Sequence, residues 1–431
     1  MKIALLMTGN ELMAGDTVDS NSCAVSKAFA QWGFDVDYKV TIGDDFDLLC
    51  AEMDRLSDLY PLVLVNGGLG PTIDDLTSEA MAKVCGVSLK ENPTAKDHVV
   101  TWCGGRSIEV SQANMKQAFL PEGAEVLHNP VGSAPGIACK KGEAWFFATP
   151  GVPSELKAML EGSVKLKLIS EFPHASGHYI RRIKLFGIGE STVQQTVVDQ
   201  LPDWPAEVDL GFRAGLPLLE IKLTVASEEL LGLRDQCEAK FTALFKDSIV
   251  GDDDDDLASL VIGLLQKKSA RIALAESCTG GKIAAMLTSI AGASAVFDAG
   301  VVSYANAAKE HFLGVNPQTI ESHGVVSEPV VIEMAQGILR EARSDLAIAV
   351  SGIAGPDGGT ANKPVGTVCI AWGGTEDMQS IEFCFPFGRQ MFQTYVSAVA
   401  LDLMRRKLSG IEELPEFLQP GGRFSKKRQT D

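Results

Sequence analysis

The sequence predicts an α/β protein made of three successive domains. Short apolar runs alternate with stretches of helical periodicity in residues 1–172 and again after residue 252, as in largely parallel sheets covered by helices. Residues 173–251 instead carry two strand patterns and two helical patterns, which indicate a smaller α+β unit. At 431 residues the chain is also too long for one ordinary core. We therefore expect domains at 1–172, 173–251 and 252–415, followed by a basic, flexible tail at 416–431.

The first domain is expected to place a ligand site at one edge of its sheet. Strands are predicted at residues 3–7, 35–40 and 61–65, and each leads directly into a polar or glycine-rich loop. Ligands of open α/β sheets bind outside the carboxyl ends of strands. The three loops that follow these strands, residues 8–11, 43–45 and 66–75, are therefore the candidate site.

The loop after the third strand combines glycines with two aspartates. Gly67, Gly68 and Gly70 would free backbone N–H groups to wrap a phosphate, while Asp74 and Asp75 supply hard oxygens for a divalent cation. Tight turns also use glycine for steric reasons alone, and acidic residues in a first helical turn stabilise the helix N-terminus without metal. Both interpretations are open from these residues.

The middle segment lacks a catalytic pattern. Strands are expected at residues 180–186 and 218–225 and helices at 190–201 and 228–245, with no cluster of His, Cys or carboxylates suited to catalysis. We expect a spacer or a dimerisation element. Five consecutive aspartates at residues 252–256 then mark a domain boundary, because runs of like charge are usually solvated.

The most informative segment is Ala275-Glu276-Ser277-Cys278-Thr279-Gly280-Gly281. An apolar run at 271–275 predicts a buried strand before it, and residues 282–290 predict a helix after it. Ser277 thus lies at a strand-to-helix turn, where the first N–H groups of the helix have no partner within it. A hydroxyl placed there suits a nucleophile beside an oxyanion hole. A helix cap or a phosphate-binding turn fits the same residues, so a catalytic role needs a base elsewhere.

The rest of the third domain supplies a candidate base and a second glycine-rich loop. A predicted strand end at 301–304 precedes a helix that carries Lys309. A buried strand at 346–350 runs into Ser351-Gly352-Ile353-Ala354-Gly355-Pro356-Asp357-Gly358-Gly359. This loop suits a phosphate or a substrate ring, and it equally suits a plain turn into the strand at 368–372.

The composition indicates which classes of partner the chain can bind. A net charge of −18 and a pI near 4.8 oppose binding of nucleic-acid backbones, and the clearest basic cluster is the tail Arg423, Lys426, Lys427 and Arg428. No apolar run approaches the length of a membrane span. Nine cysteines without a Cys-x-x-Cys pair suit a reduced protein. We therefore expect a cytoplasmic protein with neither a membrane nor a nucleic-acid partner.

Motifs of the first domain together resemble the CinA family of competence/damage-inducible proteins. They are Thr8-Gly9-Asn10-Glu11-Leu12, Gly67-Gly68-Leu69-Gly70-Pro71-Thr72-x-Asp74-Asp75-Leu76-Thr77, Asn114-x-Lys116-Gln117-Ala118, Asn129-Pro130-Val131-Gly132-Ser133-Ala134-Pro135-Gly136 and Pro150-Gly151-Val152-Pro153-Ser154-Glu155. The resemblance implies a parallel-sheet, molybdopterin-binding-like fold with metal-dependent ADP-ribose pyrophosphatase activity. The middle segment resembles the KH-like segment of the same family, although the Gly-x-x-Gly clamp of nucleic-acid-binding KH domains is not evident.

The resemblance also implies roles for residues of the three loops. Asp44 and Asp75 are expected in catalysis, and Asp74 and Asp75 in binding a divalent metal ion of unspecified identity. Substrate binding is expected of Glu11, Gly67, Gly68, Gly70, Thr72 and Lys116. Two departures from the family pattern bear on this activity: Asn10 stands where many relatives carry Asp, and residues 107–113 differ from the usual approach to Lys116.

The third domain resembles the nicotinamide-nucleotide amidase domain, which ends CinA proteins and also occurs alone. The resemblance rests on residues 275–281 and 351–359, Tyr304-x-Asn306-x-x-Lys309 and Gly324-Val325-Val326-Ser327. It implies hydrolysis of the carboxamide of nicotinamide mononucleotide, without a cofactor, to nicotinate mononucleotide and ammonia. Ser277 is the expected nucleophile and Lys309 the expected base. The other expected site residues are Tyr304 to orient Lys309, the N–H groups of Thr279, Gly280 and Gly281 to hold the oxyanion, and Asn306, Ser351, Gly352, Gly355 and Arg389 to bind substrate.

Together, these implications describe an enzyme of pyridine-nucleotide salvage that forms a homodimer. Its expected partners are two small nucleotides, nicotinamide mononucleotide and ADP-ribose. The alternative is a binding or regulatory protein that acts in competence through a partner, in which both glycine-rich loops only hold nucleotides and the first domain is not catalytic. Release of ammonia by the third domain would separate the two hypotheses for that domain.

Overall fold

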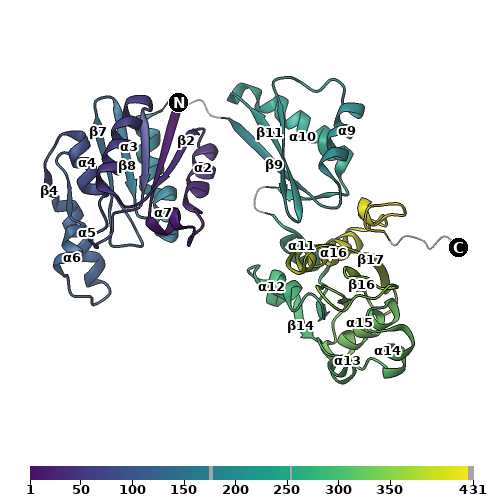
Figure 1. Cartoon of the computed structure of the whole chain (residues 1–431). Coiled ribbons are helices and arrows are strands. Elements are labelled where there is room, and N and C mark those ends of the chain that lie inside the picture. Colours follow the sequence, from purple (N-terminus) through teal and green to yellow (C-terminus); the bar gives the residue numbers. More distant parts are fainter. Residues whose placement is uncertain (174–177, 253–254, 426–431) are drawn as a thin grey trace. The chain divides into compact units, whose positions relative to one another are not determined.

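The computed structural model describes residues 1–173, 178–252 and 255–425. The chain forms two compact units, Met1–Ile180 with Val225–Leu231 and Arg181–Thr224 with Gly232–Asp431 (Figure 1). Two residues of the aspartate run, Asp253 and Asp254, lie outside the described residues, as do Lys426, Lys427 and Arg428 of the basic tail.

The first unit contains a six-stranded sheet with a parallel centre. In spatial order its strands are β2 (Asp35–Ile42), β1 (Lys2–Thr8), β3 (Leu62–Asn66), β8 (Ala144–Thr149), β7 (Gly136–Lys141) and β6 (Glu125–Leu127). The first four strands are parallel, while β7 and β6 continue the sheet antiparallel. Thr8 pairs with Ile42, and Met7 pairs with Asn66. The predicted loops after β1, β2 and β3 therefore leave the same edge of the sheet.

Helices cover both faces of this sheet, which explains why its central strands are almost continuously apolar. One face packs on α3 (Phe46–Leu59), α4 (Thr77–Cys85) and α5 (Pro93–Gly104). The other packs on α2 (Asn21–Gln31), α7 (Pro153–Met159), the π-helix η1 (Leu160–Val164) and α8 (Lys165–Glu171). The remaining elements are α1 (Asn10–Ala14), α6 (Gln112–Lys116) and the two-stranded ribbon of β4 (Leu89–Glu91) and β5 (Phe119–Pro121).

The middle segment forms a four-stranded sheet where the sequence predicted only two strands. The spatial order is β10 (Asp209–Gly215), β11 (Leu218–Val225), β9 (Tyr179–Leu185) and β12 (Ile249–Asp252), with helices α9 (Glu190–Gln200), η2 (Glu228–Leu230) and α10 (Leu231–Phe245). The sequence pattern missed β10 because none of its residues is fully buried, and it missed β12 because this short strand ends in the aspartate run.

A five-stranded sheet carries the third domain. Its spatial order is β14 (Phe297–Val302), β13 (Ile272–Glu276), β15 (Leu346–Gly352), β16 (Thr367–Gly373) and β17 (Gln379–Cys384). The first three strands are parallel and the last two antiparallel. The helices are α11 (Leu257–Lys268), α12 (Lys282–Thr288), η3 (Ala293–Ala295), α13 (Asn306–Leu313), α14 (Pro317–His323), α15 (Glu328–Ala342), α16 (Arg389–Ser409) and η4 (Glu416–Leu418). Asp256 caps α11 through its bond from Ser259 N, so the end of the aspartate run begins a helix.

The two faces of this sheet differ in side-chain size. The face toward α11, α12 and α16 presents large residues such as Leu274 and Ile348, whereas the face toward α15 presents small ones such as Ala273 and Ala347. Small strand residues let α15 approach closely. On another side of α15, Gly337 packs against the end of α13, where an added Cβ would overlap the carbonyl oxygen of Leu313. Sequence periodicity alone does not show this sorting.

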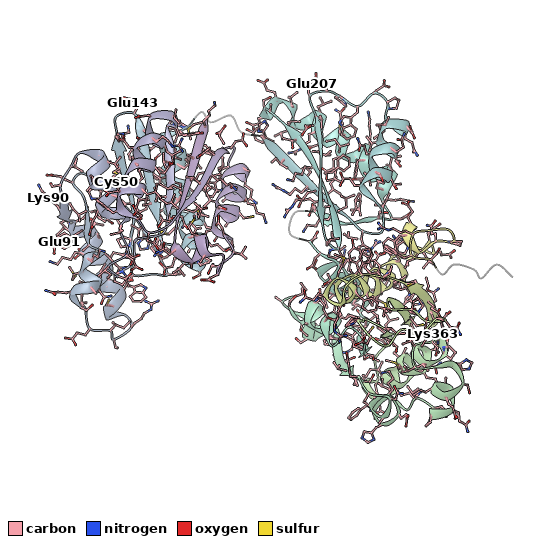
Figure 2. The ribbon with its side chains drawn as sticks, viewed as in Figure 1. Cys50, Lys90, Glu91, Glu143, Glu207 and Lys363 are labelled. Carbon is pink, nitrogen blue, oxygen red and sulfur yellow. The ribbon has the colours of Figure 1, made fainter. Side chains whose placement is uncertain are left out.

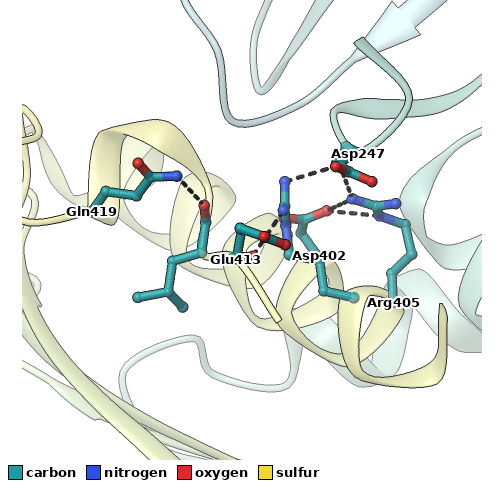
Figure 3. Close-up of polar contacts among 7 residues, drawn as sticks. Asp247, Asp402, Arg405, Glu413 and Gln419 are labelled. Atoms are coloured by element: carbon teal, nitrogen blue, oxygen red, sulfur yellow. Dashed lines mark hydrogen bonds and ion pairs between the residues drawn. The ribbon is translucent and has the colours of Figure 1, made fainter. Parts of the chain in front are cut away.

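A buried ion-pair network anchors α16 (Figure 3). Asp402 is fully buried and accepts from Arg405 and Arg406, each at 2.7 Å. Both guanidinium groups also donate to the carbonyl oxygen of Asp247, at 2.8 and 3.0 Å. The network fixes the helix whose first residue is Arg389. Among the helices formed by the described residues, none has the length and apolar character needed to cross a bilayer.

Candidate functional site

Ser277 and Lys309 meet at the carboxyl end of the third-domain sheet. Lys309 Nζ donates to Ser277 Oγ at 2.9 Å and to the carbonyl oxygen of Ser303 at 2.6 Å. The fold explains this contact, because Ser303 N bonds to Glu276 O and so extends the β13–β14 pairing by one residue. Only 1% of Lys309 and 8% of Ser277 are exposed. The two predicted catalytic side chains therefore form a buried pair.

Burial sets the protonation of this site. It lowers the pKa of Lys309 to about 8, from an ordinary value of 10.5. Burial also raises the pKa of the Cys278 thiol to about 12, so this thiol stays protonated near neutral pH. A protonated thiol is a poor nucleophile. The electrostatics therefore favour Ser277 over its neighbour.

Glu276 is a site residue that the sequence reasoning missed. Its carboxylate is buried and accepts hydrogen bonds from Gly281 N at 3.0 Å, Ile283 N at 3.1 Å and Ala284 N at 2.8 Å. It therefore satisfies the first N–H groups of α12 and fixes the turn that carries Ser277. An acidic residue ending an otherwise apolar buried strand was the available signal.

The expectation that Gly280 and Gly281 hold the oxyanion is wrong. The N–H of Gly281 bonds to Glu276, and that of Gly280 bonds to the carbonyl oxygen of Ser277. A different donor is left beside them. Thr279 is buried, and its Oγ1 has no hydrogen-bond partner among the described residues.

Tyr304 does not orient Lys309, contrary to expectation. This residue is 58% exposed, and its hydroxyl accepts from Arg389 Nη2 at 2.6 Å. The carbonyl oxygen of Ser303 orients the amine instead. The physical reason is the direction of the chain: Ser303 directly follows β14 and is fully buried, whereas Tyr304 lies in the exposed loop before α13.

A cavity of about 270 Å³ opens beside the Ser277–Lys309 pair. It is lined by residues of five segments: Ser277 and Cys278; Tyr304, Asn306 and Lys309; Val325 and Val326; Ser351, Gly352, Ile353, Ala354, Gly355, Asp357 and Gly358; and Arg389. Arg389 Nη1 donates to the carbonyl oxygen of Gly355 at 3.0 Å, and Ser351 Oγ donates to Val325 O at 2.9 Å. The structure thus brings the expected substrate-binding residues Asn306, Ser351, Gly352, Gly355 and Arg389 to one cavity.

The second glycine-rich loop is held in place by close packing. A Cβ on Gly352 would lie 3.0 Å from both Cys278 Sγ and the carbonyl oxygen of Thr367. Lys363 fastens the following turn by donating to His323 O and Val326 O, each at 2.7 Å (labelled in Figure 2). The cavity wall is therefore built on fixed backbone.

In the first unit, Asp44 joins the loops after β1 and β2. It accepts from Thr8 Oγ1 at 2.8 Å and from Asn10 N at 2.9 Å, while its own N–H donates to Asn10 Oδ1 at 3.1 Å. The amide oxygen of Asn10 thus accepts one backbone bond, as a carboxylate would. Glu11 lies exposed on α1.

The glycines of the third loop pack against the chain itself. A Cβ on Gly67 would lie 2.6 Å from Thr8 O, one on Gly68 2.5 Å from Thr77 Oγ1, and one on Gly70 2.5 Å from Asp75 Oδ2. In each case, an atom of the chain itself fills the space that a side chain would need. These contacts support the steric interpretation of these three positions.

Of the two aspartates of this loop, Asp74 is exposed and Asp75 is partly buried. Asp75 Oδ2 accepts from Thr72 N at 2.8 Å and from Thr72 Oγ1 at 2.5 Å. Lys116 Nζ donates to the backbone carbonyl oxygens of Thr72 and Asp75, each at 2.8 Å. The pKa of the neighbouring Asp74 carboxyl is lowered, chiefly by hydrogen bonding with the Thr72 side chain and also by the charge of nearby Lys116. Among the described residues, no three His, Cys, Asp or Glu side chains gather closely enough to form a metal site from protein alone.

Comparisons with known proteins agree with this architecture. The family model of the CinA C-terminal domain matches residues 254–408, and that of the probable molybdopterin binding domain matches residues 4–169. A CinA-like protein from Colwellia psychrerythraea strain 34H is 41% identical over 420 residues, covering 97% of each chain. A CinA-like protein from a Shewanella species, strain ANA-3, is 37% identical over 427 residues, covering 99% of this chain and 100% of its own. The solved competence/damage inducible protein CihA from Agrobacterium tumefaciens is 40% identical, covers 36% of this chain and 93% of its own, and has a TM-score of 0.35. Since the identity to the CinA-like proteins extends over nearly the whole chain, this protein belongs to the CinA family, with a molybdopterin-binding-like domain followed by a CinA C-terminal domain.

Proposed function

We propose that the third domain hydrolyses the carboxamide of nicotinamide mononucleotide to nicotinate mononucleotide and ammonia. The observation that carries this proposal is the buried Lys309 amine, 2.9 Å from Ser277 Oγ, with its pKa lowered to about 8. A lysine with this pKa is a competent general base near neutral pH. The choice of substrate rests on the resemblance of residues 275–281 and 304–309 to nicotinamide-nucleotide amidases.

The proposed mechanism uses two proton transfers at Lys309 in each half-reaction. The neutral amine takes the Ser277 proton as Oγ bonds to the amide carbon, and the resulting ammonium returns a proton to the leaving nitrogen. Ammonia departs and leaves nicotinate mononucleotide esterified to Ser277. Lys309 then takes a proton from water as it attacks the ester, and returns that proton to Ser277 as the acid is released. The Ser303 carbonyl holds the amine throughout.

The oxyanion donors in this mechanism differ from those expected from the sequence. Gly280 and Gly281 are occupied, so we assign one donor to the hydroxyl of Thr279, which is buried without a partner among the described residues. A buried donor that lacks a partner is costly in the free protein, and a developing oxyanion would satisfy it.

Arg389 is assigned to the substrate phosphate. Its guanidinium is held at the cavity by the Gly355 carbonyl and the Tyr304 hydroxyl, so its direction is set before substrate binds. Arginine suits phosphate because its planar fork donates two parallel hydrogen bonds. Tyr304 thereby gains a role in positioning Arg389 rather than Lys309.

The test is ammonia release by the full chain from nicotinamide mononucleotide in the presence of a chelator. We expect turnover in the unmodified protein and its near-complete loss in Ser277→Ala. Ser289→Ala is a matched control, because this exposed serine directly follows α12 and its hydroxyl donates to Met286 O at 2.7 Å. Ammonia release that survives in Ser277→Ala would refute the serine mechanism.

We infer a second activity for the first unit, metal-dependent hydrolysis of the diphosphate of ADP-ribose. Asp74 and Asp75 would hold a divalent ion, since Asp74 is exposed and the Thr72 bonds use only Oδ2 of Asp75, which leaves its other oxygen out of those bonds. Mg²⁺ commonly uses one or two carboxylates with water and substrate phosphates, which suits a loop without a larger ligand cluster. Such an ion would neutralise phosphate charge, and Asp44 and Lys116 would lie beside the substrate at the same sheet edge.

ADP-ribose, with and without Mg²⁺, tests this second proposal. We expect adenosine monophosphate and ribose 5-phosphate from the unmodified chain, and loss of both in Asp75→Asn. Calorimetry of ADP-ribose binding separates binding from turnover. Binding without turnover under any divalent ion would support the alternative, a nucleotide-binding regulatory domain.

A further inference from the structure

Two thiols distant in sequence meet inside the first unit. Cys85 is the last residue of α4 and Cys139 lies in β7, and their Sγ atoms are 3.5 Å apart. Cys85 is half-buried, whereas only 7% of Cys139 is exposed. The helix and the strand pack on the same core, so the contact joins two fixed elements.

We propose that Cys85 and Cys139 form a reversible oxidation site, at which a small disulfide such as glutathione disulfide converts the two thiols into an intramolecular disulfide. The sulfur atoms need to approach by about 1.5 Å to reach a bonding distance near 2 Å. Side-chain rotation within a packed helix–strand contact can supply such a shift. The proposal concerns the first unit and does not depend on the proposed activities.

The surroundings of the two thiols set the order of the steps. Cys85 is the accessible member, and its hydrogen bond with Cys139, aided by Lys141, lowers its pKa. The same contact and burial raise the pKa of Cys139. Cys85 thiolate therefore attacks glutathione disulfide first, forming a mixed disulfide and releasing one glutathione. Cys139 then attacks the Cys85 sulfur and releases the second glutathione, so the protein loses two electrons and two protons and glutathione disulfide gains them.

The disulfide would join the two ends of a long chain segment. The two cysteines are 54 positions apart, and α5, α6 and the β4–β5 ribbon lie between them in sequence (Figure 1). Closing so long a loop restricts the unfolded chain and stabilises the folded one. At its other end, α4 begins at Thr77, whose hydroxyl donates to Gly67 O at 2.8 Å. The cross-linked helix is thus the one on which the glycine loop rests.

The test equilibrates the full chain with glutathione and glutathione disulfide, then maps disulfides by mass spectrometry of unreduced peptides. We expect a Cys85–Cys139 link, reversed by dithiothreitol, and a rise of roughly 5 °C or more in the melting temperature of the first unit. Cys139→Ser should accumulate glutathione on Cys85, whereas Cys85→Ser should carry none on Cys139. Cys50→Ser, at another buried cysteine of the same core, is the matched control and should form the link normally (Cys50 is labelled in Figure 2).

Two outcomes would overturn the proposal. One is the absence of a Cys85–Cys139 link in the folded protein even in glutathione disulfide alone, with all buried thiols reacting only after unfolding. The other is glutathione appearing on Cys139 in Cys85→Ser as readily as on Cys85 in Cys139→Ser, which would mean that the pair does not act in the order given by its burial.

Discussion

The pKa of Lys309 offers the sharpest test of the amidase proposal. With its ordinary pKa of 10.5, about one lysine in 3,000 is neutral at pH 7, whereas a pKa of about 8 leaves about one in eleven neutral. Burial thus raises the population of competent base about 300-fold. The pH dependence of kcat/KM reflects the ionisation of groups in the free enzyme. We therefore expect kcat/KM to rise about tenfold per pH unit below pH 8 and to level off above it.

The substitution Lys309→Arg removes the base while it keeps the charge. Arginine does not release its proton in proteins, so we expect kcat to fall by about 10²–10⁴ while nicotinate mononucleotide still binds. Lys282→Arg is the matched control, because Lys282 Nζ donates to Thr394 Oγ1 of α16 at 2.8 Å and, among the described residues, makes no hydrogen bond with Ser277. Ammonia release is measured from pH 6.5 to 9.5 at constant ionic strength. A flat profile, or near-normal turnover in Lys309→Arg, would refute the base role.

The same pKa predicts a stability change of defined sign. Since the folded pKa, about 8, lies below the unfolded value, the unfolded chain binds more protons between pH 8 and 10.5. The free energy of unfolding should therefore rise with pH in this window, by about 3 kcal/mol from this group. Chemical denaturation of the unmodified chain and Lys309→Met isolates the effect as the change in their difference. A difference that stays constant with pH would show that the amine is not held at a lowered pKa.

Three further predictions concern the same cavity and its support. Cys278→Ala should keep most of the ammonia release, because the thiol stays protonated, and loss comparable to that of Ser277→Ala would implicate the sulfur. Arg389→Met should raise KM for nicotinamide mononucleotide at least about tenfold but leave nicotinamide riboside, which lacks the phosphate, unaffected; equal effects on both would contradict a phosphate role. Glu276→Gln should lower the unfolding free energy by roughly 1–3 kcal/mol, since an amide NH₂ would face a backbone donor, and an unchanged denaturation midpoint would show that the carboxylate is dispensable.

The sequence predicts the parts of the fold that are buried on both faces. β1, β3, β13 and β15 are continuous apolar runs because helices cover both sides of their sheets, and their ends place the motif loops correctly. β10 shows no such pattern because it is only half-buried. The large and small faces of the third-domain sheet depend on which helix lies over each face, and local periodicity does not contain that information.

The residues of the candidate site could be predicted from the sequence, but several of their hydrogen bonds could not. The Ser277–Lys309 pair came from family resemblance, since only the β13–β14 pairing brings the two residues together. The donors of the α12 N-terminus were assigned to an oxyanion because a sequence does not show which acceptor takes each N–H. In the fold, Glu276 takes them first.

The placement of Glu276 has a consequence for Lys309. A carboxylate one residue from the nucleophile would ordinarily pair with the lysine and raise its pKa, which would remove the base near neutral pH. Three backbone N–H groups hold this carboxylate instead, and Lys309 is left with two neutral oxygen partners, Ser277 Oγ and Ser303 O. Desolvation then acts on the amine without a carboxylate to offset it, and the pKa falls. The bonds that exclude Gly281 from the oxyanion hole are thus the bonds that keep the acidic side chain away from the base.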